Sequence, residues 1–379
     1  MEEFDVAVVG AGALGSAAAH HLALRGATVV LFEQFEFGHV RGASHDTSRI
    51  LRTSYGDEAY VRLAKSAYRD WAELERVSGE RLVTTTGGVV FVPPGSPYPV
   101  TAFTAALTAQ DLPFELMDRD AVAARWPQFA LPPGVETVFS PDTGIVPASR
   151  TVATLQMQAR SHGAVLRDRT RVEELRPQPD GVVVMTTAGT VRARKVVVAA
   201  DAWTNALIAP LGVEVPLVTM QEQVTYFGPD RPEDFGDDRL PVWIWEDEPC
   251  YYGFPTYGEP TVKAGRDASD NRMTPGERTF RHSEELLDQL RTFMRGFLPA
   301  SGADVRTITC QYTLTPGRRF VLDALPEHPD VLVALGAAHA FKFTPTIGRI
   351  LAELALDGRT DDDISAFRLR DVLAPVPTA

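Results

Sequence analysis

The sequence contains little cysteine, since Cys250 and Cys310 are the only two in 379 residues. Two cysteines provide neither a disulfide framework nor a thiolate metal cluster, so we expect no metal centre. Chains that are poor in cysteine are typical of reducing compartments, and we therefore expect a cytoplasmic protein.

Long apolar runs are also missing. A membrane-spanning helix needs about 18 or more consecutive apolar residues, and no such run occurs, so we expect no membrane span. The first strand-like segment starts directly after Met1-Glu2-Glu3. We therefore expect no signal peptide, which would need a basic and an apolar region before this strand.

Positive charge is in short supply. The 37 Lys and Arg residues are outnumbered by 50 Asp and Glu, which gives a formal net charge of -13. Because no basic block offsets the acidic excess, we expect no nucleic-acid partner and no attraction to an anionic membrane surface. The basic residues that do occur in short motifs are therefore interpreted as parts of a site.

The apolar content is ordinary for a folded protein, at 44%. The length suffices for two domains with substantial cores. No internal repeat is visible.

The segment from Phe4 to Glu33 predicts a dinucleotide site. The apolar residues 5–9 form a short strand, residues 16–25 follow a helical period, and residues 28–32 form a second strand that ends at Glu33. Between strand and helix lies the glycine pattern Gly10, Gly12, Ala13, Leu14 and Gly15. Its glycines allow a tight turn, and the free N–H groups of the helix start suit a pyrophosphate. Glu33 would accept hydrogen bonds from a ribose and disfavours a 2′-phosphate, but the pattern does not separate NAD from FAD.

Further elements follow along the chain. Residues 38–52 form a polar loop without a period until its end, which is typical of a functional or disordered loop. An amphipathic helix is expected over 60–74, and Ser149 is expected to cap a helix over 151–162. Strand-like residues 195–200 return to the nucleotide-binding sheet, and a last helix is expected over 346–356. We therefore predict a discontinuous nucleotide-binding domain of residues 1–85, 148–215 and 318–379, and a second domain of residues 86–147 and 216–317.

Four stretches together resemble the monomeric sarcosine oxidase and N-methyltryptophan oxidase family, within the D-amino-acid-oxidase-like flavoenzymes. They are GAGALG with Glu33; SHDTSRILR at 44–52; YYGFPTYG at 251–258 with Lys263 eleven residues beyond Tyr252; and CQYTLTPGRRFVLDALPEH at 310–328 followed by AHAFKF. The resemblance covers nearly the whole chain. It implies an α/β fold with a Rossmann-like FAD-binding domain and a mixed-sheet substrate domain, with FAD as the cofactor.

The resemblance also implies roles for cysteine and for cations. By the resemblance, Cys310 in its C-x-Y-T context would form a thioether to the flavin. Without the resemblance, a single cysteine in a strand is interpreted either as an inert core residue or as a site residue. Cys250 is expected to be core. Arg52 and Lys342 would hold the substrate carboxylate, although a lysine between two aromatic residues often snorkels at a surface. Lys263 would stabilise the negative charge that forms when O₂ is reduced, and its alternative is an exposed strand lysine.

Other residues are assigned to the flavin or substrate by the same resemblance. Arg49 would lie at the flavin face, and His45 and Tyr252 would line the catalytic site. Tyr312 is either a site residue or core. The remaining cofactor contacts would be Ser44, Ser48, Val172, Ala200, Trp203 and Gly336.

Three positions depart from the family's pattern. Asp267 stands where the family has a histidine, Trp243 replaces a smaller flexible residue, and Ala340 replaces a glycine. These positions are expected at the substrate pocket or the flavin edge, so we expect a flatter or larger substrate than sarcosine. Asp267 would accept a hydrogen bond from a substrate amine or simply be solvated.

The function expected is FAD-dependent oxidation of the C–N bond of a secondary or cyclic amino acid, giving an imine and H₂O₂. The partners would be a small amino acid and O₂, and the protein would be a monomer or a small homo-oligomer. Two alternatives stay open. One is a flavin dehydrogenase, or biosynthetic desaturase of a ring imino acid, that uses another acceptor. The other is a non-catalytic FAD-binding scaffold.

Overall fold

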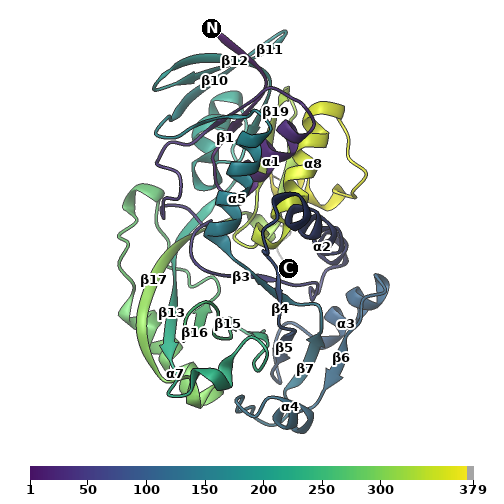
Figure 1. Ribbon diagram of the computed structural model, residues 1–379, viewed down its shortest axis with the longest axis vertical. Coiled ribbons are helices and arrows are strands. Elements are labelled where there is room, and N and C mark those ends of the chain that lie inside the picture. Colours follow the sequence, from purple (N-terminus) through teal and green to yellow (C-terminus); the bar gives the residue numbers. More distant parts are fainter. Residues whose placement is uncertain (374–379) are drawn as a thin grey trace.

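The structure is a computed structural model that describes residues 1–373, and it is built on two large sheets, one at each end of an elongated molecule (Figure 1). Residues 374–379, which the sequence assigns to the nucleotide-binding domain, lie outside the described residues. Within residues 1–373 no helix is both long and apolar enough to cross a membrane.

The first sheet has a parallel centre. β1 (Glu2–Val9) pairs in parallel with β2 (Val29–Phe32) on one side and with β12 (Gly189–Val198) on the other. β9 (Val165–Arg167) extends the sheet beyond β2, and β19 (His328–Leu335) pairs with the end of β12. β18 (Val321–Leu325), β10 (Val172–Gln178) and β11 (Gly181–Thr186) complete it through antiparallel pairs. Because the central strands are covered on both faces, they are apolar along their buried length.

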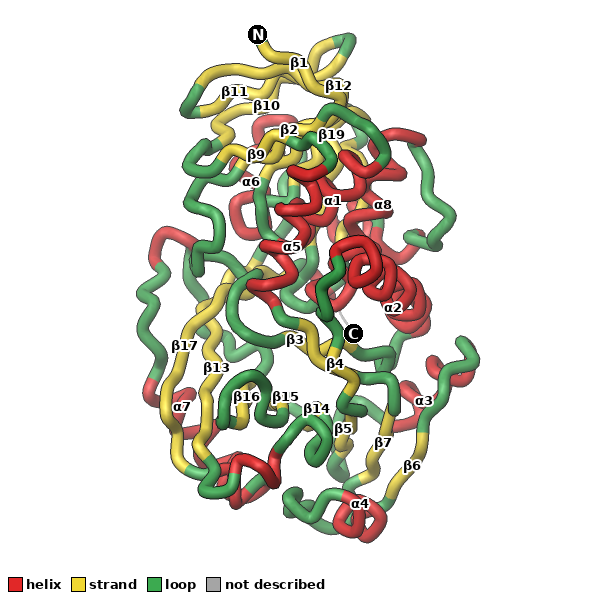
Figure 2. The backbone as a smooth tube through the Cα atoms, in the orientation of Figure 1, coloured by secondary structure: helices red, strands yellow, loops and turns green. Residues whose placement is uncertain are grey.

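Helices cover one face of this sheet (Figure 2). α1 (Ala13–Leu24) packs against α5 (Ala148–Ser161) and α8 (Thr344–Asp357), and α2 (Glu58–Ser78) packs against α8. The other face carries α6 (Thr204–Ile208) and α9 (Leu369–Leu373), whose apolar residues join the core formed by β10, β11 and β12. α5 starts after Pro147, which puts Ser149 inside the first turn, where its side chain does not cap the helix. The expected cap was therefore wrong.

The second sheet holds eight strands in the order β17-β13-β16-β15-β14-β5-β7-β6. All neighbours are antiparallel except β14 and β5. The strands are β5 (Gly88–Val92), β6 (Glu115–Met117), β7 (Glu136–Ser140), β13 (Val218–Gly228), β14 (Val242–Trp245), β15 (Tyr251–Phe254), β16 (Val262–Arg266) and β17 (Ala303–Leu314). α3 (Val100–Ala109), α4 (Arg119–Arg125) and α7 (Glu284–Phe297) belong to the same half of the molecule (Figure 1).

A small third sheet lies between the two large ones (Figure 1). β8 (Gly144–Val146) pairs with β3 (Arg49–Leu51) and with β4 (Thr84–Thr85). β3 follows the connecting segment of residues 33–48, so its pairing with β8 anchors the end of that segment. The strands of the two large sheets come from the segments that the sequence assigns to two domains, and the domain boundaries themselves stay a prediction.

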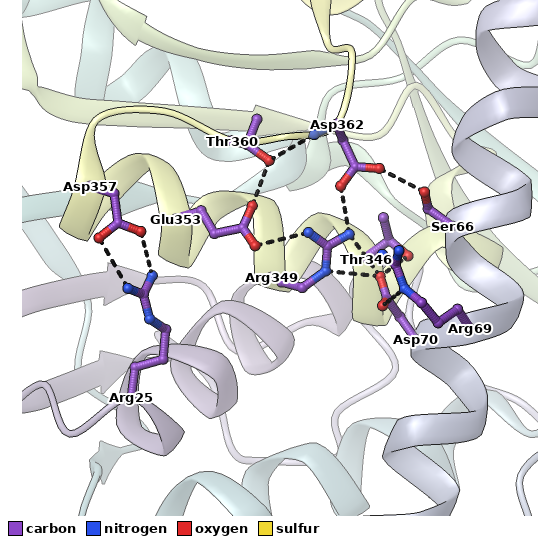
Figure 3. A network of polar contacts seen from close by, with 10 residues as sticks. All are labelled: Arg25, Ser66, Arg69, Asp70, Thr346, Arg349, Glu353, Asp357, Thr360 and Asp362. Atoms are coloured by element: carbon purple, nitrogen blue, oxygen red, sulfur yellow. Dashed lines mark hydrogen bonds and ion pairs between the residues drawn. The ribbon is translucent and has the colours of Figure 1, made fainter.

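A network of charged side chains joins α2 to α8 and the segment after it (Figure 3). The guanidinium of Arg349 donates to Asp70 at 3.0 and 3.1 Å, to Glu353 at 2.9 Å and to Asp362 at 2.6 Å. The Asp70 side chain is only 7% exposed and also accepts from Thr346. α8 ends at Gly358, whose φ of 72° suits glycine, but α9 follows, so α8 is not the last helix as the sequence suggested.

Candidate active site

One large cavity runs from the glycine turn after β1 to the strands of the second sheet, with a volume of about 1340 Å³. Most of the residues singled out from the sequence line it. The cofactor set at its walls comprises Gly10, Gly12, Ala13, Leu14, Glu33, Ser44, Ser48, Arg49, Val172, Ala200, Trp203, Cys310, Gly336 and Lys342. Gly15 is not among the residues that line the cavity, and its contact with the cofactor stays a prediction.

Gly15 instead permits the turn that forms one end of the cavity. A Cβ atom at Gly15 would overlap the carbonyl oxygen of Gly10, so the helix can approach the strand this closely only with glycine here. Gly10 has a φ of 98°, a conformation that favours glycine. The N-terminus of α1 has no side-chain cap at Gly12, and it opens towards the cavity. This end of α1 has the character of an anion site.

Glu33 lies at the end of β2 and is 6% exposed. Its carboxylate accepts from the backbone N–H of Ala11 and of Phe35, both at 3.0 Å, and lies 3.3 Å from His39. Burial raises the pKa of this carboxyl, but the hydrogen bonds from His39 and the two amides outweigh burial, and the pKa lies below its ordinary value. Glu33 is therefore held as an anion.

Lys263 on β16 is a buried residue that lines the cavity. Its Nζ donates to the Asp46 carboxylate at 2.5 Å and to the carbonyl and hydroxyl of Ser48, both at 3.1 Å. Burial lowers the pKa of Lys263 to about 8, although Asp46 opposes the shift. The alternative of an exposed strand lysine is excluded, because the side chain is 4% exposed.

His45 lies in the loop before β3, and Arg49 is the first residue of β3. The guanidinium of Arg49 donates to the carbonyls of Ser48, Ala43 and His45, each at 2.8 Å, which fixes the loop around it. His45 is buried and lines the cavity, and its Nε2 has no hydrogen-bond partner among residues 1–373. Burial, and then the positive charge of Arg49, lower the pKa of His45 to about 4. His45 is therefore neutral at physiological pH.

Arg52 and Lys342 are two basic side chains of the cavity that form no ion pair with a carboxylate among residues 1–373. Arg52 donates to the carbonyl of Ser54 at 2.7 Å and lies 4.4 Å from the ring centre of Tyr55. Lys342 donates to the carbonyl of His339 at 2.8 Å and lies 5.4 Å from the same ring. Burial, and then the charge of Arg52, hold the pKa of Lys342 well below its usual range. An anion between the two cations would offset both effects.

Cys310, Tyr252 and Tyr312 line the wall formed by the second sheet. Cys310 is 7% exposed, and burial raises its pKa to about 11, whereas the nearby Arg49 lowers it. The hydroxyls of Tyr252 and Tyr312 are 3.4 Å apart. Burial holds the pKa of both tyrosines above the ordinary value, so both hydroxyls stay protonated. Tyr312 is thus a cavity residue and not only core.

Comparisons with known proteins identify the family. Residues 5–354 match the family model described as FAD dependent oxidoreductase. The chain is 33% identical to monomeric sarcosine oxidase of Bacillus sp. (strain B-0618), over 97% of this chain and 95% of that protein. It is 30% identical to N-methyl-L-tryptophan oxidase of Yersinia pestis (strain Pestoides F), over 97% and 99%. A solved structure of NikD, described as an unusual amino acid oxidase essential for nikkomycin biosynthesis, superimposes with a TM-score of 0.85 at 30% identity, covering 97% and 98%.

The chain belongs to the FAD-dependent oxidoreductases. The family resemblance, the α/β fold and the enzyme class expected from the sequence are confirmed.

The cavity of this FAD-dependent oxidoreductase fits FAD. Gly10 and Gly15 allow the tight turn between β1 and α1, because a Cβ at either position would overlap a backbone carbonyl. The start of α1 borders the cavity, and Glu33 lies at the end of β2 for a ribose. The unpartnered Nε2 of buried His45 provides a hydrogen-bonding atom further along. Among residues 1–373 no group of three or more His, Cys, Asp and Glu side chains is arranged to hold a metal ion.

Asp267 of the oxidoreductase lines the cavity, but it already has a partner. Its carboxylate accepts from Arg318 at 2.5 and 3.2 Å. Neither expectation for Asp267, a free acceptor or a solvated surface acid, describes this ion pair. Ala340 also lines the cavity and packs beside Gly336, at whose position an added Cβ would meet that of Ala340.

Trp243 does not line the cavity. It is fully buried in the core under the second sheet, where its ring centre lies 4.8 Å from that of Phe297 and 6.1 Å from that of Phe293 on α7. Its strand partner Gly253 leaves room for the indole. The expectation that Trp243 shapes the substrate pocket is therefore corrected, because side chains alternate between the faces of a strand and the indole points to the α7 face.

Cys250 was expected in the core, but it is half-buried and lines the cavity. Burial raises the pKa of its thiol well above the usual range, which keeps it in the unreactive protonated form. Both cysteines are free thiols.

Sequence reasoning missed three charged residues. Asp46 lies within the motif of residues 44–52 but received no role, and Arg318 lies in the stretch after Cys310. Arg278 is buried and donates to the carbonyls of Val40, Arg41 and Thr309, so it ties the polar loop to β17 beside Cys310. No local pattern marks Arg278, because all three carbonyls are far from it in sequence. Asp46 carried a signal in being an acid among the cations of its motif.

Proposed function

We propose that this protein is an FAD-dependent oxidase of the C–N bond of a secondary or cyclic amino acid, of the sarcosine, N-methyl amino acid or imino-acid type, giving an imine and H₂O₂. The observation that carries the proposal is the pair of cavity cations, Arg52 and Lys342, which form no ion pair with an acidic side chain in the described part of the chain. The similarity to sarcosine and N-methyltryptophan oxidases supports the same class of substrate.

FAD would be held by the glycine turn, Glu33 and the loop of residues 44–49, and when bound it supplies the two-electron acceptor for the C–N bond. We propose that it is attached covalently through Cys310, which is the free thiol on β17 at the cavity wall. The family resemblance supports this thioether.

The chain's own residues would bind and orient the substrate. The planar guanidinium of Arg52 matches a carboxylate and Lys342 adds charge, so the carboxylate fixes which carbon faces the cofactor. The protonated hydroxyls of Tyr252 and Tyr312, which line the cavity on β15 and β17, would donate hydrogen bonds to the substrate. The carboxylate of Asp267 is already paired with Arg318, so we do not assign it as a base. The substrate amine would be oxidised to the imine without a proton transfer to Asp267.

Lys263 and Arg49 would stabilise the negative charge that forms as O₂ is reduced, since charges fixed in a water-poor site act strongly. A cytoplasmic location and a monomeric or small oligomeric state complete the proposal, and the two free thiols favour a reducing compartment.

The test is peroxide release by the purified, flavin-loaded protein in air. Sarcosine, N-methyl aromatic amino acids, proline, pipecolate and their ring-unsaturated relatives are offered, each beside its carboxamide as the matched control. We expect flavin bleaching without air and peroxide with air for at least one acid, and neither for its amide. Bleaching without later peroxide would instead indicate a dehydrogenase or desaturase with another acceptor. Equal response to acid and amide would contradict the carboxylate anchor.

A further inference from the structure

The Lys263–Asp46 ion pair is unusually enclosed. The two side chains are 4% and 6% exposed, and Nζ and Oδ2 are 2.5 Å apart. The other oxygen of Asp46 accepts from the hydroxyl of Tyr226 at 2.5 Å. Both side chains line the cavity, so the negative charge of Asp46 acts on the same part of the cavity as the positive charge of Lys263.

Asp46 reaches this position through a strained backbone. Its φ is 85°, in the left-handed region that a non-glycine residue rarely adopts. Its carbonyl accepts from the backbone N–H of Ser149, and its side chain accepts from Lys263 and Tyr226, so the conformation is held from three directions. Backbone strain of this kind often accompanies a functional position.

Every element packed around Lys263 contributes to its charge environment. The loop before β3 brings Asp46 and the hydroxyl of Ser48, and β3 brings Arg49, whose Nη1 lies 3.9 Å from Asp46. β15 places the ring of Phe254 4.9 Å from Nζ, and β13 places the ring of Tyr226 at 5.8 Å. Cys310 on β17, which is neutral both as a thiol and as the proposed thioether, and neutral His45 complete the surroundings. Asp46 is thus the only anion that the structure places against Lys263 within residues 1–373.

We propose that Asp46 is a positioning residue for O₂ reduction: it keeps the Lys263 side chain charged and fixes its direction at the cavity wall. This inference rests on the proposed oxidase function and on the role assigned there to Lys263. Burial and the charge of Arg49 both favour the neutral amine, and Asp46 opposes them. Without Asp46 the lysine would release its proton at a lower pH and lose its charge in the physiological range.

The test uses the flavin-loaded protein and two readouts. The first is the pH dependence of reoxidation by O₂ in a stopped-flow experiment, after reduction by dithionite so that no substrate is needed. The wild-type rate should fall as pH rises through about 8, where Lys263 loses its proton. In Asp46→Asn the midpoint should move down by about one unit or more, because an opposite charge in contact shifts a pKa by about that much. Asp46→Glu should restore the midpoint.

The second readout is the absorbance of the resting oxidised flavin against pH, which requires no turnover. The transition of Lys263 should move down in Asp46→Asn and vanish in Lys263→Met. A merely structural role of Asp46 would lower the reoxidation rate equally at all pH values with both midpoints unchanged, and that result would overturn the proposal.

Failure of the oxidase function would look different. In that case wild type and Lys263→Met would both reoxidise slowly at every pH, while the absorbance midpoint would still move in Asp46→Asn. Should Asp46→Asn not fold, Asp46→Ser tests the same shift, since the lysine can release its proton and need not stay buried as an unpaired charge. An unmoved absorbance midpoint in either variant would refute the proposal.

Discussion

At the residue scale, Arg52 has N–H groups available for a substrate, because its hydrogen bond to the carbonyl of Ser54 uses only one of the five donors of the guanidinium. We predict that Arg52→Ala weakens binding of carboxylate substrates by about 1.5–3 kcal/mol, the usual value of a charged hydrogen bond, which corresponds to a KM raised roughly 10- to 100-fold. The KM of Arg52→Lys, which keeps the charge but not the planar guanidinium, should lie between those of wild type and Arg52→Ala. Steady-state kinetics on the best acid of the peroxide assay measures this. An unchanged KM in Arg52→Ala would remove Arg52 from the anchor.

Cys310 and Cys250 provide a matched pair, since both line the cavity and both are free thiols. We predict that Cys310→Ser releases all its flavin into the supernatant on acid precipitation, whereas the wild type and Cys250→Ser keep it in the pellet. The reason is that a thioether survives denaturation and a non-covalent site does not. Free flavin from the acid-treated wild type would show that the covalent link is absent.

Residue-level reasoning worked where the chemistry is local and failed where it depends on the far side of a strand. The glycine turn and Glu33 could be placed at the cavity because each has its requirement within a few residues, whereas Cys310 was assigned to it by the family resemblance; the contacts of all three with the cofactor stay predictions. Trp243 could not, because the sequence shows that it lies in a strand but not which face of the sheet holds α7. Asp46 and Lys263 are 217 residues apart, and only folding brings them together.

Elements were predictable in kind because their apolar periods are strong. The amphipathic stretch near Trp71 became α2, whose N-terminus is capped by the side chain of Asp57. What the sequence did not show is how elements are tied together. The contacts of Arg349 on α8 reach Asp70 on α2, 279 residues away.

At the element scale the network between α2 and α8 predicts a difference in stability. Arg349→Met leaves Asp70, 7% exposed, without its main counter-ion, and breaking such a buried pair costs about 3–5 kcal/mol. Arg25→Met is the matched control, because Arg25 and Asp357 are 40% and 43% exposed and such pairs contribute about 0–1 kcal/mol. Chemical denaturation of both variants measures the difference (Figure 3). Equal losses would mean that the network does not hold α2 against α8.

For the whole molecule, buried histidines predict a loss of stability in mild acid. Burial lowers the pKa of His20 on α1 to about 4, below the ordinary value of about 6.5. The unfolded chain therefore binds a proton that the folded chain refuses, and the free energy of unfolding falls as pH drops from about 6.5 towards 4.

The test is urea unfolding of wild type and His20→Phe. Between pH 7.5 and pH 5 the wild type should lose about 2 kcal/mol more than the variant, from this single group. Between pH 7.5 and 8.5 the two should run parallel, since His20 is neutral there in both states. A parallel course down to pH 5 would show that His20 is not the group that titrates.

The parallel order of the first sheet sets when this protein can take its shape during synthesis. β1, the first strand made, has β12 as a neighbour, with Ala7 opposite Val196, and β12 in turn pairs with β19 through Val198 and Val333. β12 ends at Val198, so more than half of the 379 residues must be released before β1 has both of its neighbours, and β19 joins the sheet only near the end of synthesis. We therefore expect one edge of the apolar β1 to stay unpaired through the first half of synthesis, and the cavity, whose lining includes Gly336 and Lys342, to be complete only when nearly the whole chain has been made.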